Sequence, residues 1–485
     1  MVTAVGQQVE TRASWPRTTR VGRLGPSEYR PLLAALPIAA AIVAGMALDL
    51  APLMTGGALV AFVAAIVSPP TGLAIVALMA PLKSPLVIPS PGFNTVLIGA
   101  TLLGCVYRLP IDRPTLRASA PLMLLLGFVL YVSVQQMPEL LSGYSGTDGH
   151  LVGYLFGQVL TLAGLVVAAA YVLKGRTPGP FVGAGLLSAF IAAVLAIATS
   201  GNLVTGPLGN LVGVSDANAR VVGPFGDPNY FGLFEATAIA AALAWMVAAR
   251  SLQLRLLLLG TSAVLALSLT VALSRGALVA LSAGFLSLGF TRNRWAGLLA
   301  IGVVVVLAAF AYPLFVQWRV AADTGGLSVQ AYAGLAESDQ ARVAAALAGP
   351  QLFASAPLFG IGFGHYSLMS APYVGFPIES HNWYVNVLAE QGIVGIALWI
   401  AMLSAVAAAL HRAARSARSV GYAVLVTYMV GSAFLEPPNS VQTSAFAVIV
   451  IVAALAGDWA DVGADGAPSR PGGLAAEARA LQAHT

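Results

Sequence analysis

The segment Leu32–Leu48 reads LLAALPIAAAIVAGMAL and decides the fold class, because it holds no charged residue and approaches the length of a membrane span. Residues 1–31 before it are basic and have no apolar core. They hold five arginines: Arg12, Arg17, Arg20, Arg23 and Arg30. A secretory signal would place its apolar run nearer to the start, ahead of a small-residue cleavage site. We therefore predict a cytoplasmic tail over 1–31, followed by an uncleaved first span.

The composition extends this prediction to the whole chain. Of 485 residues, 58% are hydrophobic and 9% are charged, with a mean hydropathy of +0.85. A soluble enzyme, a nucleic-acid-binding domain or a disordered chain would need far more charge. About 281 apolar residues suffice for about fourteen spans of roughly 20 residues each. We predict an all-α, polytopic membrane bundle of about 14 transmembrane helices. Twelve is the competing number, because the runs from Thr71 and Gly276 are short.

The basic residues predict the orientation of this bundle. With the N-terminus inside and the loops alternating, 19 of the 24 lysines and arginines fall in cytoplasmic segments, as the positive-inside rule requires. Both termini are therefore predicted to be cytoplasmic. The other five fall outside: Lys83, Arg220, Arg275, Arg319 and Arg342.

The polar segments divide the chain into a membrane bundle, loops and tails. The bundle is predicted over 32–457 and a disordered cytoplasmic tail over 458–485. The longest polar segments fall outside, over 200–228 and 316–391, and the second should contain short helices. Long loops on one face of a bundle carry function, so we expect extracytoplasmic chemistry.

Two of the outer arginines stand beside chain-breaking motifs. Arg220 precedes Gly223–Asn229 (GPFGDPN), after which a helix should open at Asn229 or Tyr230 with Asn229 as a good N-cap. Arg275 lies in the turn Ser274–Ala277 (SRGA). Helix N-termini and guanidinium groups both suit phosphate. The alternatives are a plain capped loop for Arg220 and contact with lipid headgroups for Arg275.

The third candidate is the block ESHNWY, which begins at Glu379 and contains His381. With an ordinary pKa near 6.5, a histidine can accept a proton from a hydroxyl at neutral pH, and Glu379 or Glu390 could orient it. Trp383 and Tyr384 could stack on sugar rings. The alternatives are a histidine bonded within its loop and an interfacial aromatic belt.

Other signals are weaker. The glycine-rich stretch Gly360–Gly364 has no strand-turn-helix context, so it does not indicate a nucleotide loop. No spacing of histidine, cysteine and carboxylate residues resembles a metal site, so neither a metal nor another cofactor is expected. Glu235 lies within a predicted span, where an acid is a functional candidate, although pairing with Arg220 is a simpler explanation.

Together these motifs resemble those of the O-antigen ligase and polysaccharide polymerase superfamily of bacterial membrane glycosyltransferases. The resemblance rests on Arg220 with Gly223–Asn229, on the SRGA motif at Ser274, on Gly360–Gly364, and on His381 and Asn382 followed by Glu390 and Gly392. The order of two arginines, a long outer loop and a histidine is also the order that the family shows.

The resemblance implies a fold like the type C glycosyltransferases and a metal-independent, inverting transfer in the bacterial inner membrane. The donor would be an undecaprenyl-diphosphate-linked oligosaccharide, with Arg220 and Arg275 on the diphosphate and His381 as the base. The other residues expected to bind substrate are Asn229, Glu379, Asn382, Trp383, Tyr384 and Glu390. Membrane lipids and other polysaccharide assembly proteins would be partners, and nucleic acid would not.

The acceptor separates two versions of this function. A cell-surface polysaccharide polymerase, which extends another carrier-linked glycan, is preferred. An O-antigen ligase, which transfers the glycan to lipid A core, is the alternative. A transporter or flippase would instead place ionisable residues at the midplane of two matching halves, a pattern that is not seen here. A scaffold without chemistry would leave the outer arginines and the His381 block unexplained.

Overall fold

The computed structural model shows an all-α chain. It describes residues 26–81, 92–112, 119–141, 143, 146–200, 221–302, 304, 329–375, 377–436, 438, 440–456 and 459. Within these ranges there is no β-strand. Arg220, both predicted tails and most of the predicted 200–228 loop lie outside the described residues.

The helices follow one another with short connections. Those before the predicted 200–228 loop are α1 (Pro26–Ala47), α2 (Ala51–Val67), α3 (Pro69–Met79), α4 (Phe93–Asp112), α5 (Ala120–Gln135), α6 (Met137–Leu141), α7 (Gly146–Leu173) and α8 (Gly179–Ser200). Those after it are the 3-10 turn η1 (Gly223–Phe225), α10 (Pro228–Ala248), α11 (Leu252–Ala272), α12 (Arg275–Arg292), α14 (Val329–Ser355), α15 (Tyr366–Val374), α16 (Trp383–Arg412), α17 (Arg415–Gly431) and α18 (Val441–Ala456).

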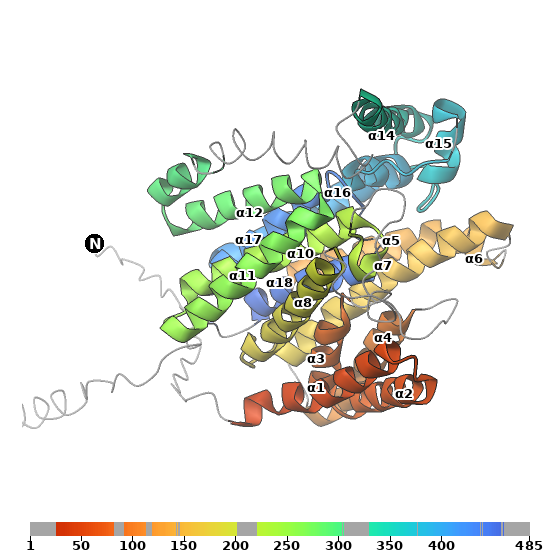
Figure 1. Cartoon of the computed structure of the whole chain (residues 1–485). Coiled ribbons are helices and arrows are strands. Elements are labelled where there is room, and N and C mark those ends of the chain that lie inside the picture. Colours follow the sequence, from red (N-terminus) through yellow and green to blue (C-terminus); the bar gives the residue numbers. More distant parts are fainter. Residues whose placement is uncertain are drawn as a thin grey trace, which may run out of the picture.

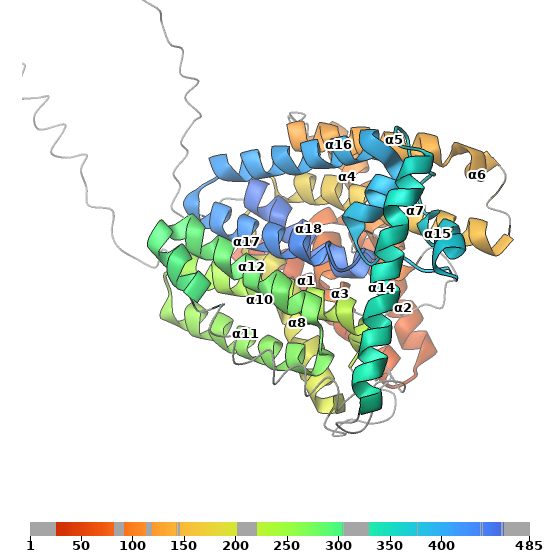
Figure 2. The ribbon, with the colours of Figure 1, turned by 90° about the horizontal axis from the view of Figure 1, so that it is seen from above.

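Most of these helices run side by side as a bundle. Figure 1 shows α8, α10, α11, α12, α17 and α18 aligned, with α1 to α4 grouped on one side. Helices α14 and α15 gather at one end, and Figure 2 shows α14 lying across the bundle there. We call this end the α14 end. It is where α10, α12, α16 and α18 begin and where α11 and α17 finish.

The bundle has the surface of a membrane protein. Among the described residues, six helices are long and apolar enough to cross a bilayer, and five shorter helices are also apolar. The six are in α1, α7, α8, α10, α11 and α16. Large apolar side chains point outward, including Leu256 and Leu257 of α11, which are 59% and 66% exposed. Exposed apolar area on this scale suits contact with lipid. The chain is therefore an all-α, multi-pass membrane protein.

Small residues bring the helices together. Gly284 of α12 faces α17 so closely that an added Cβ would meet Thr427 and the carbonyl of Ala423. Gly72 of α3 is packed in the same way against Ala65 and Thr101. Helices in lipid associate through such close packing, because the surrounding hydrocarbon leaves no hydrophobic drive between them.

We expect Gly284→Leu to lower the midpoint of thermal unfolding in detergent, because it forces α12 and α17 apart. Overpacking of this kind costs about 1–3 kcal/mol. Gly260→Leu on α11 is the matched control, since no atom lies within 4 Å of its added Cβ. Fluorescence-detected unfolding of both purified variants would make the comparison, and an equal midpoint for the two would contradict this account of the packing.

Candidate active site

Loops and helix starts from four parts of the chain meet at the α14 end. The Ser274 hydroxyl donates to Asn229 Oδ1 at 3.3 Å, which joins the start of α12 to the start of α10. Gly276 lies so close to Phe434 that an added Cβ would touch that side chain. The N–H of Trp383 donates to the carbonyl of Ser432 at 2.8 Å. The segments that hold Asn229, Arg275 and His381 are thus brought to one place.

The start of α10 departs from prediction in one respect. The helix begins at Pro228 and its N-cap is Asp227, not Asn229. Asp227 Oδ1 accepts from the N–H groups of Asn229 and Tyr230 at 2.7 and 3.1 Å. Proline is well suited to the first helical position, and this places the cap one residue before it. The Asn229 side chain is left to contact Ser274.

Arg275 is the first residue of α12. Ser274 caps this helix, and the preceding residue, Leu273, has a left-handed φ of 50°. The tight turn between two apolar helices that the sequence predicts is confirmed. Its side chain is half-buried. At this position Arg275 adds its charge to the positive end of the helix dipole.

His381 lies in the loop before α16 with a left-handed φ of 54°. Such a backbone is unfavourable for a residue with a Cβ and is found where the surroundings enforce it. The next residue, Asn382, is the N-cap of α16 and accepts from the N–H groups of Tyr384 and Val385 at 3.0 and 3.2 Å. The loop is therefore anchored on its C-terminal side by the helix start.

Glu436 holds this loop from below, and the sequence analysis did not single it out. Its Oε1 accepts from the N–H of Asn382 at 3.0 Å and from the Ser380 hydroxyl at 3.3 Å. The N–H of His381 also donates to this carboxyl group. Glu436 is 2% exposed. The available signal was an acid followed by Pro437 and Pro438, beside an apolar run, although many surface loops share that pattern.

Burial changes the pKa of the groups around His381. It raises the pKa of Glu436 to about 8, and the neighbouring charge of Glu379 adds to the rise, while hydrogen bonds from Ser380 and the backbone oppose it. Burial also raises the pKa of Glu379, against a hydrogen bond from Asn386. Burial lowers the pKa of His381, Arg342 lowers it further, and Asp227 opposes the change. His381 is thereby kept neutral, the form that can accept a proton.

Arg342 is an outer arginine to which the sequence analysis gave no role. It lies on α14, one turn before Ala345, whose carbonyl accepts from the Tyr366 hydroxyl. Gly349, one turn further on, packs against Val385 in the first turn of α16. Residues 342, 345 and 349 share one face of a helix. That face is turned toward the start of α16 and places the Arg342 charge near His381.

Glu390 has a structural role rather than the predicted one of orienting His381. Its Oε1 accepts from the N–H of Tyr366 at 2.8 Å and so caps the start of α15. The side chain is 4% exposed. Glu379 is also engaged elsewhere, since it accepts from Asn386 Nδ2 at 3.3 Å. The acid whose charge acts on His381 is Asp227.

The predicted sugar-stacking aromatics face the interior. Trp383 is 1% exposed and meets Trp399 edge-on, with ring centroids 5.6 Å apart. Tyr384 donates its hydroxyl to the carbonyl of Met429 at 2.8 Å. Packing between α16 and its neighbours has taken up both rings, so they are not presented to a sugar.

The glycine-rich stretch fills a break in α16. Gly392 interrupts this helix with a φ of 64°. The N–H groups of Ile361 and Gly362 donate to the carbonyls of Ala389 and Glu390 at 3.0 and 2.9 Å. At Gly360 an added Cβ would collide with the Glu390 carbonyl. Gly360–Gly364 is thus a packing partner of the broken helix.

Two negative observations complete the site. Within the described ranges, no group of three or more histidine, cysteine or acidic residues is placed to hold a metal ion. Glu235, the predicted intramembrane acid, is fully buried on α10, and neither of its carboxyl oxygens has a hydrogen-bond partner among the described residues.

These features define a multi-pass membrane protein with a polar, basic site assembled from loops at one end of its bundle. Residues 260–400 match the family model described as O-antigen ligase. The matched segment includes Arg275 and His381, and it confirms the resemblance to the O-antigen ligase and polymerase superfamily. The chain is thus a membrane enzyme of this general type. No curated protein matches it.

The buried carboxyl groups predict a pH-dependent stability. Because the folded-state pKa of Glu436 is raised from 4.5 to about 8, its contribution is present below pH 4.5 and is lost as the pH rises through 8. We expect the thermal unfolding midpoint to fall between pH 7 and 9. Glu436→Gln keeps an acceptor but cannot ionise, so its midpoint should fall less. A decline of the same slope in both proteins would contradict this role of Glu436.

Proposed function

We propose that the chain transfers a glycan from an undecaprenyl-diphosphate-type carrier to an acceptor hydroxyl on the extracytoplasmic side of the bacterial inner membrane. The observation that carries the proposal is the convergence of Arg275 and the His381 loop at the α14 end, inside the segment that matches the O-antigen ligase family. A cation and a base held together beside a membrane surface suit a reaction with an anionic leaving group.

The reaction would be a single in-line displacement with inversion. The acceptor oxygen attacks the anomeric carbon while the bond from that carbon to the diphosphate oxygen breaks. The hydroxyl proton passes to the neutral imidazole of His381. The diphosphate leaves with the bonding electrons, and Arg275 neutralises its charge. Arg220, which lies outside the described residues, is proposed as the second guanidinium, and this chemistry requires no metal.

The distribution of charge supports the proposed orientation. At the end opposite the α14 end, helix termini and turns carry most of the described basic residues. They include Arg108, Lys174, Arg176, Arg250, Arg255, Arg292, Arg294, Arg412, Arg415 and Arg418. The α14 end carries Arg275 and Arg342. By the positive-inside rule, the α14 end is extracytoplasmic. About fourteen spans, with both termini inside and a long outer loop over 316–391, remain our proposal for the complete topology.

Replacement of His381 or Arg275 by alanine tests the proposal directly. General-base catalysis contributes about 10²–10⁴-fold and an electrostatic donor about 10²–10³-fold, so either variant should lose at least 10²-fold in rate. The assay would follow a lipid-diphosphate-linked glycan with purified protein in liposomes. Arg250→Ala, at the opposite end, is the control. Full activity of either site variant would exclude the mechanism.

The same assay separates the two acceptors. Chain growth without lipid A core would identify a polymerase, which we favour, and transfer to added core would identify a ligase. Loss of transfer on addition of a chelator would contradict the metal-independent scheme.

Arg342 should shift the pH dependence of this activity. Because His381 must be neutral to act as base and its pKa is lowered, the rate should rise with pH through a value below 6.5. In Arg342→Gln the repulsion that disfavours the imidazolium is removed, so the acid limb of the profile should move to higher pH. Arg250→Gln should leave the limb in place. An unshifted limb in Arg342→Gln would show that its charge does not reach the base.

A further inference from the structure

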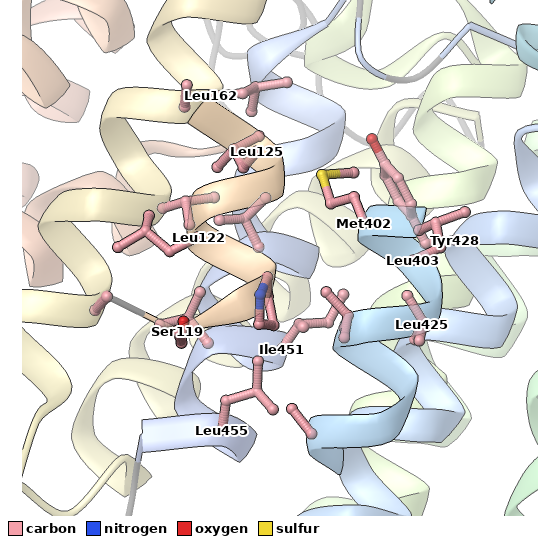
Figure 3. Close-up of a pocket in the computed structure, with 18 of the residues that line it drawn as sticks. Ser119, Leu122, Leu125, Leu162, Met402, Leu403, Leu425, Tyr428, Ile451 and Leu455 are labelled. Atoms are coloured by element: carbon pink, nitrogen blue, oxygen red, sulfur yellow. The ribbon is translucent and has the colours of Figure 1, made fainter. Parts of the chain in front are cut away.

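An apolar cavity of about 780 Å³ lies between α5, α7, α16, α17 and α18. Figure 3 shows labelled side chains from all five helices around one common space. The labelled residues are Ser119, Leu122, Leu125, Leu162, Met402, Leu403, Leu425, Tyr428, Ile451 and Leu455. An apolar cavity is poorly hydrated and accepts apolar ligands. A cavity of this size within a membrane bundle therefore suits hydrocarbon.

The cavity extends along the half of α16 away from His381. Along this helix its lining runs from Trp399 to Arg412. At 1.5 Å per residue this is about 20 Å. The hydrocarbon core of a bilayer is roughly 30 Å thick, so the cavity is about as deep as one leaflet. That depth matches the acyl chains of a phospholipid.

Two cations lie at the end of the cavity opposite the α14 end. Lys174, which follows α7, and Arg412, which ends α16, both belong to its lining. The surroundings are basic as well, with Arg176, Arg415 and Arg418 close along the chain. The described acid packed against this region is Glu28, which accepts from Thr177 at 2.7 Å. Basic pockets between transmembrane helices recognise anionic lipid headgroups.

We propose that this cavity binds an anionic phospholipid, with its phosphate at Lys174 and Arg412 and its acyl chains between α16 and the α7–α18 pair. Helix α7 packs against α18, whereas α5 packs against α16. The lipid would fill the space between these two pairs and complete the packing of α16, the helix that begins beside His381. This site is separate from the proposed transfer chemistry, and its test needs no catalytic activity.

The test measures which lipid stays with the protein. The full chain would be placed in nanodiscs of equal phosphatidylglycerol and phosphatidylcholine and extracted into mild detergent, and retained lipids would be counted by mass spectrometry. We expect phosphatidylglycerol to exceed phosphatidylcholine by about tenfold, as two cationic contacts imply. In Lys174→Gln/Arg412→Gln this preference should disappear. Ala409→Leu, which fills the cavity and keeps both charges, should lower retention of both lipids.

Controls separate a built site from general attraction to a basic surface. Arg250→Gln/Arg294→Gln removes two charges at the same end but outside the cavity lining, and it should retain the wild-type preference. Gel filtration would confirm that each variant elutes as a folded protein. Equal retention of the two phospholipids by wild type, or unchanged retention in Ala409→Leu, would overturn the proposal. Recovery of a polyprenyl phosphate instead would assign the cavity to a different lipid and would also overturn it.

Discussion

Every interruption of a helix in this bundle needs a partner for its freed backbone groups, because hydrocarbon offers none. Two interruptions flank the first turns of α16. At Gly392 the missing bonds are supplied by the backbone of the glycine-rich stretch that precedes α15. Before α16 they are supplied by a carboxyl group, which receives the N–H of Asn382 and the hydroxyl of Ser380. The polar segment between these two points is held at both ends.

This constraint explains why the candidate site is assembled from parts far apart in sequence. The turn at Ser274 touches the start of α10, and the 432–436 loop touches both the Ser274–Gly276 turn and the start of α16. Each contact satisfies a polar group or fills a space that would otherwise be empty. The same contacts place Arg275 and His381 at one end of the bundle. Catalytic geometry and backbone satisfaction are thus supplied by the same small set of interactions.

The sequence predicted the parts of this structure that depend on local pattern. Apolar runs located the helices, and the SRGA motif located the turn at Arg275. Asn382 and His381 were found because their polar block interrupts an otherwise apolar sequence. The partners of these residues were not predictable, because they depend on which helices pack together. Glu390 looked like a companion of His381 but caps α15 instead, and Glu436 escaped notice 55 residues downstream. Trp383 looked like a ligand contact until packing against Trp399 buried it.

The left-handed backbone at His381 has an evolutionary consequence. For a residue with a Cβ this conformation costs roughly 1–2 kcal/mol, whereas glycine adopts it freely. A loop selected for stability alone would drift toward glycine or asparagine at this position. Retention of the imidazole in distant descendants of this gene would therefore mark selection for its chemistry, and its replacement by glycine would mark lineages that have abandoned it.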